Sequence, residues 1–163
     1  LTGHLVLSTI HTNSATATIT RLIEMGAQTH LIASSLIGVI AQRLIRKLCP
    51  HCKQKYTPTN EELKLILPIT EEKEEFLDNK IYKNVGCEEC NFTGYVGRIG
   101  IYEILPIGRE IKKMIVQSSA AHEIEEVAIG CGMKTLQRAG LNAILSGETS
   151  TSEYLRVLGA VNE

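Results

Sequence analysis

Cys49-Pro50-His51-Cys52 and Cys87-Glu88-Glu89-Cys90 are two C-x-x-C motifs, and thirty-four residues separate the second cysteine of the first motif from the first cysteine of the other. A C-x-x-C turn directs both of its sulfurs toward one centre, so two such turns supply four thiolates. Four thiolates are a closed tetrahedral ligand set for a structural Zn²⁺. Two disulfides or unrelated thiols are the alternative, which a single C-x-x-C would leave open. The paired motifs therefore predict a zinc site formed by Cys49, Cys52, Cys87 and Cys90.

Length and composition are those of a globular chain. The 163 residues suffice for one ordinary domain or two small ones, and a hydrophobic content of 44% permits a core. A net charge of −1 provides no basic field that would collect nucleic acid or anionic lipid. The longest apolar stretch, residues 31–41, contains Ser34 and Ser35 and is too short to span a bilayer. We therefore expect no transmembrane segment and no nucleic-acid partner.

The cysteine content and the first residues bear on where the protein is found and on whether the chain is complete. Five cysteines, four of them at metal-ligand spacing, are more typical of the reducing cytoplasm than of an oxidising compartment. We also expect no signal peptide. It opens on Leu1-Thr2-Gly3-His4 without a methionine, so we expect it to be a piece of a longer chain.

The amino-terminal stretch predicts a strand, a polar turn and a helix. Residues 4–9 are apolar and β-branched in the middle, which is typical of a buried strand, and Ile10-His11-Thr12-Asn13 follows directly. Asn13 is a suitable N-cap for a helix over residues 14–25, which Gly26 would end. In α/β sheets ligands bind just outside the carboxyl ends of strands, so His11 lies where a ligand would bind. Position alone does not distinguish this interpretation from a histidine that bonds its own turn.

The segments around the two cysteine motifs are predicted to form short helices and strands. We expect a short helix over residues 30–36, extended chain over residues 38–48, and strands at residues 81–83 and 98–105. Thr59 and Glu62 form a capping box for a helix through residue 67, and a second, acidic helix is predicted over residues 70–78. The acidic run and the basic cluster over residues 43–55 are interpreted as solvated surfaces.

The remainder of the chain, from Gly108 onward, is predicted to be helical. One-sided apolar faces indicate four short helices, the second capped by Ser119, the third over residues 133–146, and the last opened by a Ser150–Glu153 capping box. Such helices predict a compact bundle. Cys131 falls on an apolar helical face, so we expect it to pack as a small apolar residue and not to bind metal.

Several stretches resemble secretion ATPases, the hexameric motors of type II secretion and type IV pilus assembly. Residues 2–15, Thr-Gly-His-Leu-Val-Leu-Ser-Thr-Ile-His-Thr-Asn-Ser-Ala, are similar to the histidine box of that family. The similarity continues in the same order along the chain, through Ile32-Ala33-Ser34-Ser35-Leu36, Ala41-Gln42-Arg43-Leu44, both cysteine motifs, Gly94-Tyr95, Gly97-Arg98, Gly100-Ile101-Tyr102-Glu103 and Gly132-Met133-Lys134-Thr135-Leu136. The tetracysteine insertion points to the secretion or pilus-extension branch.

The resemblance implies an α/β fold: an incomplete RecA-like P-loop ATPase sheet with an inserted tetracysteine zinc subdomain and a small carboxyl-terminal helical bundle. It divides the chain into the carboxyl-terminal part of the ATPase domain (1–48), the zinc subdomain (49–95), a return strand (96–107) and a helical subdomain (108–163). It also implies a homo-hexamer in the full-length protein, which lies in the cytoplasm, peripheral at the inner membrane, and works on the inner-membrane platform of the secretion or pilus machine.

The resemblance assigns roles to two histidines. His11 would contact or sense the γ-phosphate of ATP, and His4 would be the leading histidine of the box; Ser14 stands where the family commonly has an aspartate. The 163 residues contain no G-x-x-x-x-G-K-[ST] phosphate loop, so ATP and Mg²⁺ would bind only in the full-length protein and this chain alone would be inactive. The alternative is a zinc-stabilised docking module without nucleotide chemistry. A nucleic-acid-binding zinc ribbon is disfavoured by the net charge and the few aromatic residues.

Overall fold

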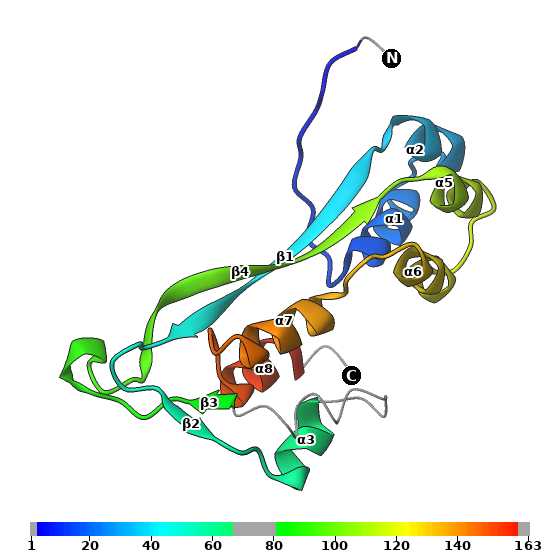
Figure 1. The fold of residues 1–163 in the computed structure, drawn as a ribbon. Helices are drawn as coiled ribbons and strands as arrows, with labels where there is room; N and C mark the ends of the chain where they lie inside the picture. The colour runs from blue at the N-terminus through cyan, green and yellow to red at the C-terminus, as the bar shows by residue number, and fades with distance from the viewer. Residues whose placement is uncertain (1–2, 67–80, 160–163) are drawn as a thin grey trace. The chain divides into compact units, whose positions relative to one another are not determined.

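A computed structural model describes residues 3–66 and 81–159 of the chain as a mixed α/β structure (Figure 1). The helices are α1 (Ala15–Glu24), α2 (Thr29–Ser35), α3 (Asn60–Ile66), α5 (Arg109–Val116), α6 (Ala121–Gly130), α7 (Leu136–Leu145) and α8 (Thr151–Leu158). The strands are β1 (Gly38–Leu48), β2 (Gln54–Tyr56), β3 (Ile81–Lys83) and β4 (Tyr95–Pro106). The strands predicted at residues 38–48, 81–83 and 98–105 are therefore confirmed. The acidic helix predicted over residues 70–78 lies outside the described residues.

The chain divides into two compact units, each made of two separate stretches. The first comprises residues 1–42 and 102–135, and the second comprises residues 43–101 and 136–163. Two strands, β1 and β4, pair with each other in a two-stranded sheet, and each contributes residues to both units. The predicted grouping of the last four helices in one bundle is not confirmed, because α5 and α6 belong to the first unit and α7 and α8 to the second.

The core of the first unit is built by four helices and the end of β4. Helix α2 packs on α5, and α6 packs on both α1 and α5. The apolar faces of these helices meet in one cluster, formed by Ala15, Ile19, Ile32, Ala33, Leu105, Ile107, Ile111, Ile115, Ile124, Ala128 and Met133. Helical spacing of the apolar residues thus predicted the buried faces of these helices, except at Cys131, which is exposed.

Helix α1 starts at a serine. The Ser14 hydroxyl accepts a hydrogen bond from the backbone N–H of Ala17 at 3.1 Å and is the N-cap, so the prediction of Asn13 in this role is wrong. Both side chains satisfy the chemistry of a cap, and the shift by one residue is within the usual uncertainty of helix ends. The helix ends before Gly26, as expected.

Residues 4–9 do not form the buried strand that was predicted. They run as an extended segment outside any sheet, and the side chains of Leu5, Val6 and Leu7 are 70%, 79% and 88% exposed. A strand requires a neighbouring strand to bond its backbone groups, and none of the described strands pairs with this segment. The apolar pattern therefore identified a segment of strand-like composition that pairs with no strand among the described residues.

The second unit combines a small antiparallel sheet with three helices. Strands β2 and β3 pair in the register Gln54↔Lys83 and Tyr56↔Ile81, and α8 packs against α7 and α3. The capping box of α3 is confirmed: the Thr59 N–H donates to Glu62 Oε2 at 3.0 Å, and the Glu62 N–H donates to Thr59 Oγ1 at 3.2 Å. The buried apolar side chains of this unit include Ile45, Leu48, Leu63, Ile66, Ile81, Leu136, Leu141, Ile144, Tyr154 and Leu158.

Glu153 is the main polar residue in the interior of the second unit. Its side chain is fully buried and accepts hydrogen bonds from the Arg46 backbone N–H (2.9 Å), Arg46 Nε (2.8 Å), Arg156 Nε (2.7 Å) and Arg156 Nη2 (2.6 Å). Burial raises the pKa of this carboxyl, but the bonds from Arg156 and Arg46 outweigh it and lower the pKa to about 2. The predicted capping box of α8 is thus half present: Ser150 Oγ accepts from the Glu153 N–H, while the carboxylate binds the arginines.

Three expectations about the carboxyl-terminal helices are corrected. Helix α6 is capped at Ala120, whose N–H donates to Glu123 Oε2 at 2.9 Å, and not at Ser119. Helix α7 begins at Leu136, three residues later than predicted. Cys131 follows the last turn of α6 and is exposed, because the helix ends before its apolar face reaches this position.

None of the described helices has the length and apolar character that crossing a bilayer requires.

The Glu153 network predicts an acid-dependent stability. Because the folded pKa of about 2 lies below the ordinary value of 4.5, the carboxylate stabilises the fold above about pH 4.5, and this stabilisation is lost as the pH falls toward 2. Glu153→Gln should lower the free energy of unfolding at pH 7 by about 3 kcal/mol, since it removes the buried charge to which Arg46 and Arg156, both about half exposed, donate in the folded state. Urea denaturation at pH 7 and pH 3 measures both effects, and the difference between the two proteins should shrink at pH 3.

The matched control is Glu148→Gln, because the Glu148 carboxylate bonds only an exposed serine, at 3.3 Å, among the contacts described for it. We expect it to change the free energy of unfolding by less than about 0.5 kcal/mol at either pH. Equal losses in the two variants would contradict the role given to Glu153.

Candidate metal centre

The backbone brings the two cysteine motifs together. Cys49 follows the last residue of β1, and Cys90 closes a 3₁₀ turn over Glu88–Cys90. The Cys49 N–H donates to the carbonyl of Gly94 at 2.9 Å, so the first motif is bonded directly to the residue before β4. The Phe92 N–H donates to the Cys87 carbonyl at 2.9 Å and tightens the second motif. These backbone hydrogen bonds hold both C-x-x-C turns in place without a contribution from a metal ion.

Four sulfur atoms converge at this place. The Sγ atoms of Cys49, Cys52, Cys87 and Cys90 all lie within 4.8 Å of one another. The Cys49–Cys87 separation is 3.9 Å, and the Cys52–Cys90 and Cys87–Cys90 separations are 3.8 Å. A tetrahedron with metal–sulfur bonds of about 2.3 Å has edges of about 3.8 Å, whereas a disulfide requires about 2.05 Å. The separations match four ligands of one ion and exclude disulfides between these pairs.

Backbone N–H groups point at the sulfurs. Cys90 Sγ accepts from the N–H groups of Cys87 and Gly94, each at 3.2 Å, and Cys52 Sγ accepts from the N–H of Gly86 at 3.3 Å. Burial raises the pKa of the Cys87 thiol to about 12. Burial also opposes ionisation of Cys90, but the backbone donors from Cys87 and Gly94 lower its pKa to about 6. Such donors stabilise thiolates, which are the form that binds a metal.

The ligand set is closed. Cys49 and Cys90 are buried and Cys52 and Cys87 are half-buried, and among the described residues His51 is not part of the cluster. A tetrahedral ion with four thiolates has no position left for water or substrate, so the arrangement is that of a structural and not a catalytic site. The cluster is compatible with a structural zinc ion, as the sequence predicted.

The histidines of the box lie in the other unit. His11 is exposed and directly precedes the turn that starts α1, and His4 is exposed on the extended segment before it. The turn itself is held by Thr12 Oγ1, which lies 2.8 Å from Thr18 Oγ1 and donates to the Ser14 carbonyl at 3.2 Å. The histidines thus belong to the first unit and the cysteine cluster to the second. His11 and His4 remain a second candidate site that the resemblance implies.

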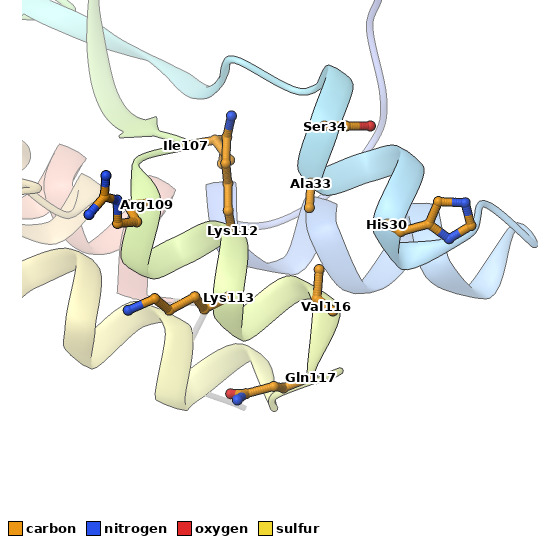
Figure 2. A pocket seen from close by; sticks show the side chains of 9 residues that line it. All are labelled: His30, Ala33, Ser34, Ile107, Arg109, Lys112, Lys113, Val116 and Gln117. Atoms are coloured by element: carbon orange, nitrogen blue, oxygen red, sulfur yellow. The ribbon is translucent and has the colours of Figure 1, made fainter.

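Sequence reasoning missed a basic groove in the first unit. It has a volume of about 730 Å³ and runs between α2 and α5. Figure 2 shows its lining side chains, which are His30, Ala33, Ser34, Ile107, Arg109, Lys112, Lys113, Val116 and Gln117. Arg109, Lys112 and Lys113 follow each other at helical spacing on α5, which was the available signal. The lining contains three cationic residues, of which Lys113 forms an ion pair with Glu110 at 3.0 Å.

Comparison with known proteins gives the family. A family model described as type II/IV secretion system protein matches residues 1–156. The chain belongs to this family. This secretion-system chain is 46% identical over 155 residues to the type IV pilus assembly ATPase PilB of Thermus thermophilus, covering 95% of this chain and 17% of that protein. It is 42% identical over 158 residues to the type IV pilus assembly ATPase TfpB of Acinetobacter baylyi, covering 97% and 26%.

The type II secretion branch is represented as well. The type II secretion system ATPase E of Vibrio cholerae is 42% identical over 157 residues, covering 96% of this chain and 30% of that protein. The chain thus spans less than a third of the length of these curated relatives. The family resemblance inferred from the histidine box and the cysteine motifs is confirmed.

The glycine before β4 allows a direct test of the cluster geometry. Gly94 has a positive φ of 77°, and a Cβ there would lie 2.6 Å from Asn84 Cβ, whereas a Cβ on Gly97 (φ 69°) would meet nothing within 4 Å. Both alanine variants bear the cost of a left-handed backbone, about 1–2 kcal/mol. Only Gly94→Ala should additionally displace the N–H that bonds Cys90 Sγ. Thermal melting should show a clearly larger loss for Gly94→Ala, and equal losses would contradict this account.

Proposed function

We propose that the chain is the carboxyl-terminal part of a cytoplasmic hexameric ATPase that powers type II protein secretion or type IV pilus assembly. The observation that supports this most is the 46% identity to a pilus assembly ATPase over 95% of the chain. The similarity extends to relatives named for both machines. The phosphate loop and the Mg²⁺ ligands would belong to other parts of the full-length protein, which acts at the inner membrane against the platform of its machine.

In this proposal the first unit contributes to the ATPase site. The extended segment before α1 would complete a RecA-like sheet, which would cover the side chains of Leu5, Val6 and Leu7 that are exposed here. His11, at the end of this segment, would sense the γ-phosphate, and His4 would support the box as its leading histidine. Support comes from the exposure of His11 and from its place three residues before Ser14, the N-cap of α1.

In the same proposal the second unit is held by one structural Zn²⁺ bound to Cys49, Cys52, Cys87 and Cys90. The ion would fix the start and end of the insertion between β1 and β4. Its role would be mechanical, because a closed thiolate shell takes no part in chemistry.

The zinc proposal predicts about one equivalent of tightly bound metal in freshly purified, reduced protein. Elemental analysis of wild type should show this amount, and Cys87→Ser should show much less. Cys131→Ser is the matched control, because Cys131 is exposed and outside the cluster, and it should keep the full amount. Less than about half an equivalent in wild type would contradict the proposal.

The isolated 163 residues should neither bind ATP tightly nor hydrolyse it. They contain no phosphate loop, and a single γ-phosphate histidine cannot replace the backbone amides and the lysine that hold the phosphates. Calorimetric titration with Mg-ATP should give no heat of binding at micromolar concentrations. A micromolar affinity would show that the box contributes far more to binding than we propose.

His11→Ala in the full-length protein tests the sensor role. A sensor that contacts the transition state should lower kcat by roughly 10²- to 10³-fold, with the hexamer and most ATP binding retained. A residue that merely braces the turn should instead lower the melting temperature and reduce binding and hydrolysis together. His122→Ala, at an exposed histidine on α6, is the control and should leave both quantities unchanged. Normal turnover of His11→Ala would end the sensor proposal.

A further inference from the structure

A buried carboxylate lies in the apolar face of β4. Successive inward positions of this strand are Ile101, Glu103 and Leu105, which are 4%, 2% and 1% exposed. Alternate residues of a strand share one face, so Glu103 occupies a position where its neighbours are aliphatic. Placing a carboxylate there is costly unless the group is well bonded. An apolar side chain of the same size would pack without that cost, so packing alone does not account for Glu103.

Glu103 binds the start of α1. Its Oε1 accepts the backbone N–H of Ala15 at 2.7 Å, across 88 residues of sequence, and Ala15 is itself fully buried. Ala15 is the first residue of α1, whose opening N–H groups have no partner within the helix. A carboxylate at this end also interacts favourably with the helix dipole, and a charge-assisted bond is short and directional.

The negative charge has a second effect nearby. Burial and the charge of Glu103 both raise the pKa of Glu125 on α6, the helix that packs against α1. Glu103 therefore influences two elements of the first unit.

The turn that follows His11 is hydrogen-bonded to the start of α1. Thr12 Oγ1 lies 2.8 Å from Thr18 Oγ1, Ser14 Oγ accepts from the Ala17 N–H, and Thr18 Oγ1 donates to the Ser14 carbonyl at 3.3 Å. These bonds connect residues no more than six positions apart, so they shape residues 12–18 without fixing where this piece lies. The bond from Ala15 to Glu103 attaches the piece to β4. His11 is the residue immediately before it.

We propose that Glu103 is a positioning residue for His11: by holding the amino end of α1 against β4, it sets where the imidazole stands relative to the γ-phosphate. This inference rests on the proposed sensor role of His11 in the full-length ATPase. Glu103 does not touch the nucleotide in this scheme. Its effect passes through the backbone of Ala15 and the bonded piece of residues 12–18, so it should alter turnover and leave nucleotide affinity nearly unchanged.

The test uses Glu103→Met and Glu103→Gln in the full-length protein. Methionine keeps the volume and removes the acceptor, while glutamine retains an oxygen that can accept from Ala15. We expect Glu103→Met to lower kcat roughly 10- to 100-fold with KM for ATP within about 2-fold of wild type, since small misplacements of a reacting group cost this much. Glu103→Gln should keep kcat within about 2- to 5-fold of wild type, because its side-chain oxygen can still accept the Ala15 N–H.

Glu123→Met is the matched control. Glu123 makes the same kind of contact, a carboxylate accepting a backbone N–H at a helix start, but it does so for Ala120 on the exposed end of α6. It should lower the melting temperature slightly, as the loss of an exposed helix cap does, and leave kcat unchanged. A kcat for Glu103→Met equal to that of Glu123→Met would overturn the inference.

A double-mutant cycle separates this inference from the function on which it rests. If Glu103 acts through His11, Glu103→Met should cause no further loss of kcat in a His11→Ala background. Additive losses would overturn the positioning role while leaving the sensor intact, whereas normal turnover of His11→Ala alone would refute the sensor itself. If Glu103→Met does not assemble, the same cycle with Glu103→Gln decides, because its smaller loss, about 2- to 5-fold, must also vanish without His11.

Discussion

The convergence of four cysteine sulfurs from motifs thirty-four residues apart is the constraint on which the second unit depends. The first motif follows β1 without a linker, and the residue bonded to Cys49, Gly94, directly precedes β4. Since β1 and β4 also pair, the insertion between them is closed twice, by a strand ladder and by the cysteine cluster. Closing a long loop costs chain entropy, and a metal bound by four thiolates would offset that cost.

Among the residues that the structure describes, each unit has a buried carboxylate that receives a backbone N–H from a distant part of the chain. Glu153 accepts from the N–H of Arg46, 107 residues away, and Glu103 accepts from that of Ala15, 88 residues away. Apolar packing is not directional, so it holds elements together without fixing their register. A short charge-assisted hydrogen bond fixes two atoms relative to each other. The two carboxylates thus define how strand and helix meet in each unit, and in the first unit the element so defined begins beside His11.

What the sequence predicted well depended on local chemistry. The Thr59–Glu62 capping box and the apolar faces of α1 and α5 concern residues that are close in sequence. The two cysteine motifs are thirty-four residues apart, but each places its own pair of sulfurs locally, and the preference of zinc for four thiolates predicted that the pairs meet. The wrong predictions concern contacts between residues that are far apart in sequence. Residues 4–9 have the composition of a strand, but a strand exists only beside another strand. Glu153 was assigned to a capping box because Ser150 precedes it by three positions, and its bond to Arg46 could not be seen from sequence. Glu103 was part of a stretch that resembles the family, but no structural role was predicted for it, because its contact with Ala15 is equally non-local.

The central claim is that four thiolates, and nothing else, hold one metal ion at the junction of the insertion with β1 and β4. X-ray absorption at the zinc edge of the purified protein tests this most directly, because it reports the number and type of ligands and not only the amount of metal. The account predicts a single shell of four sulfur atoms at about 2.3 Å. A shell with a nitrogen or oxygen at about 2.0–2.1 Å, as His51 or a water molecule would give, would contradict the closed centre described here.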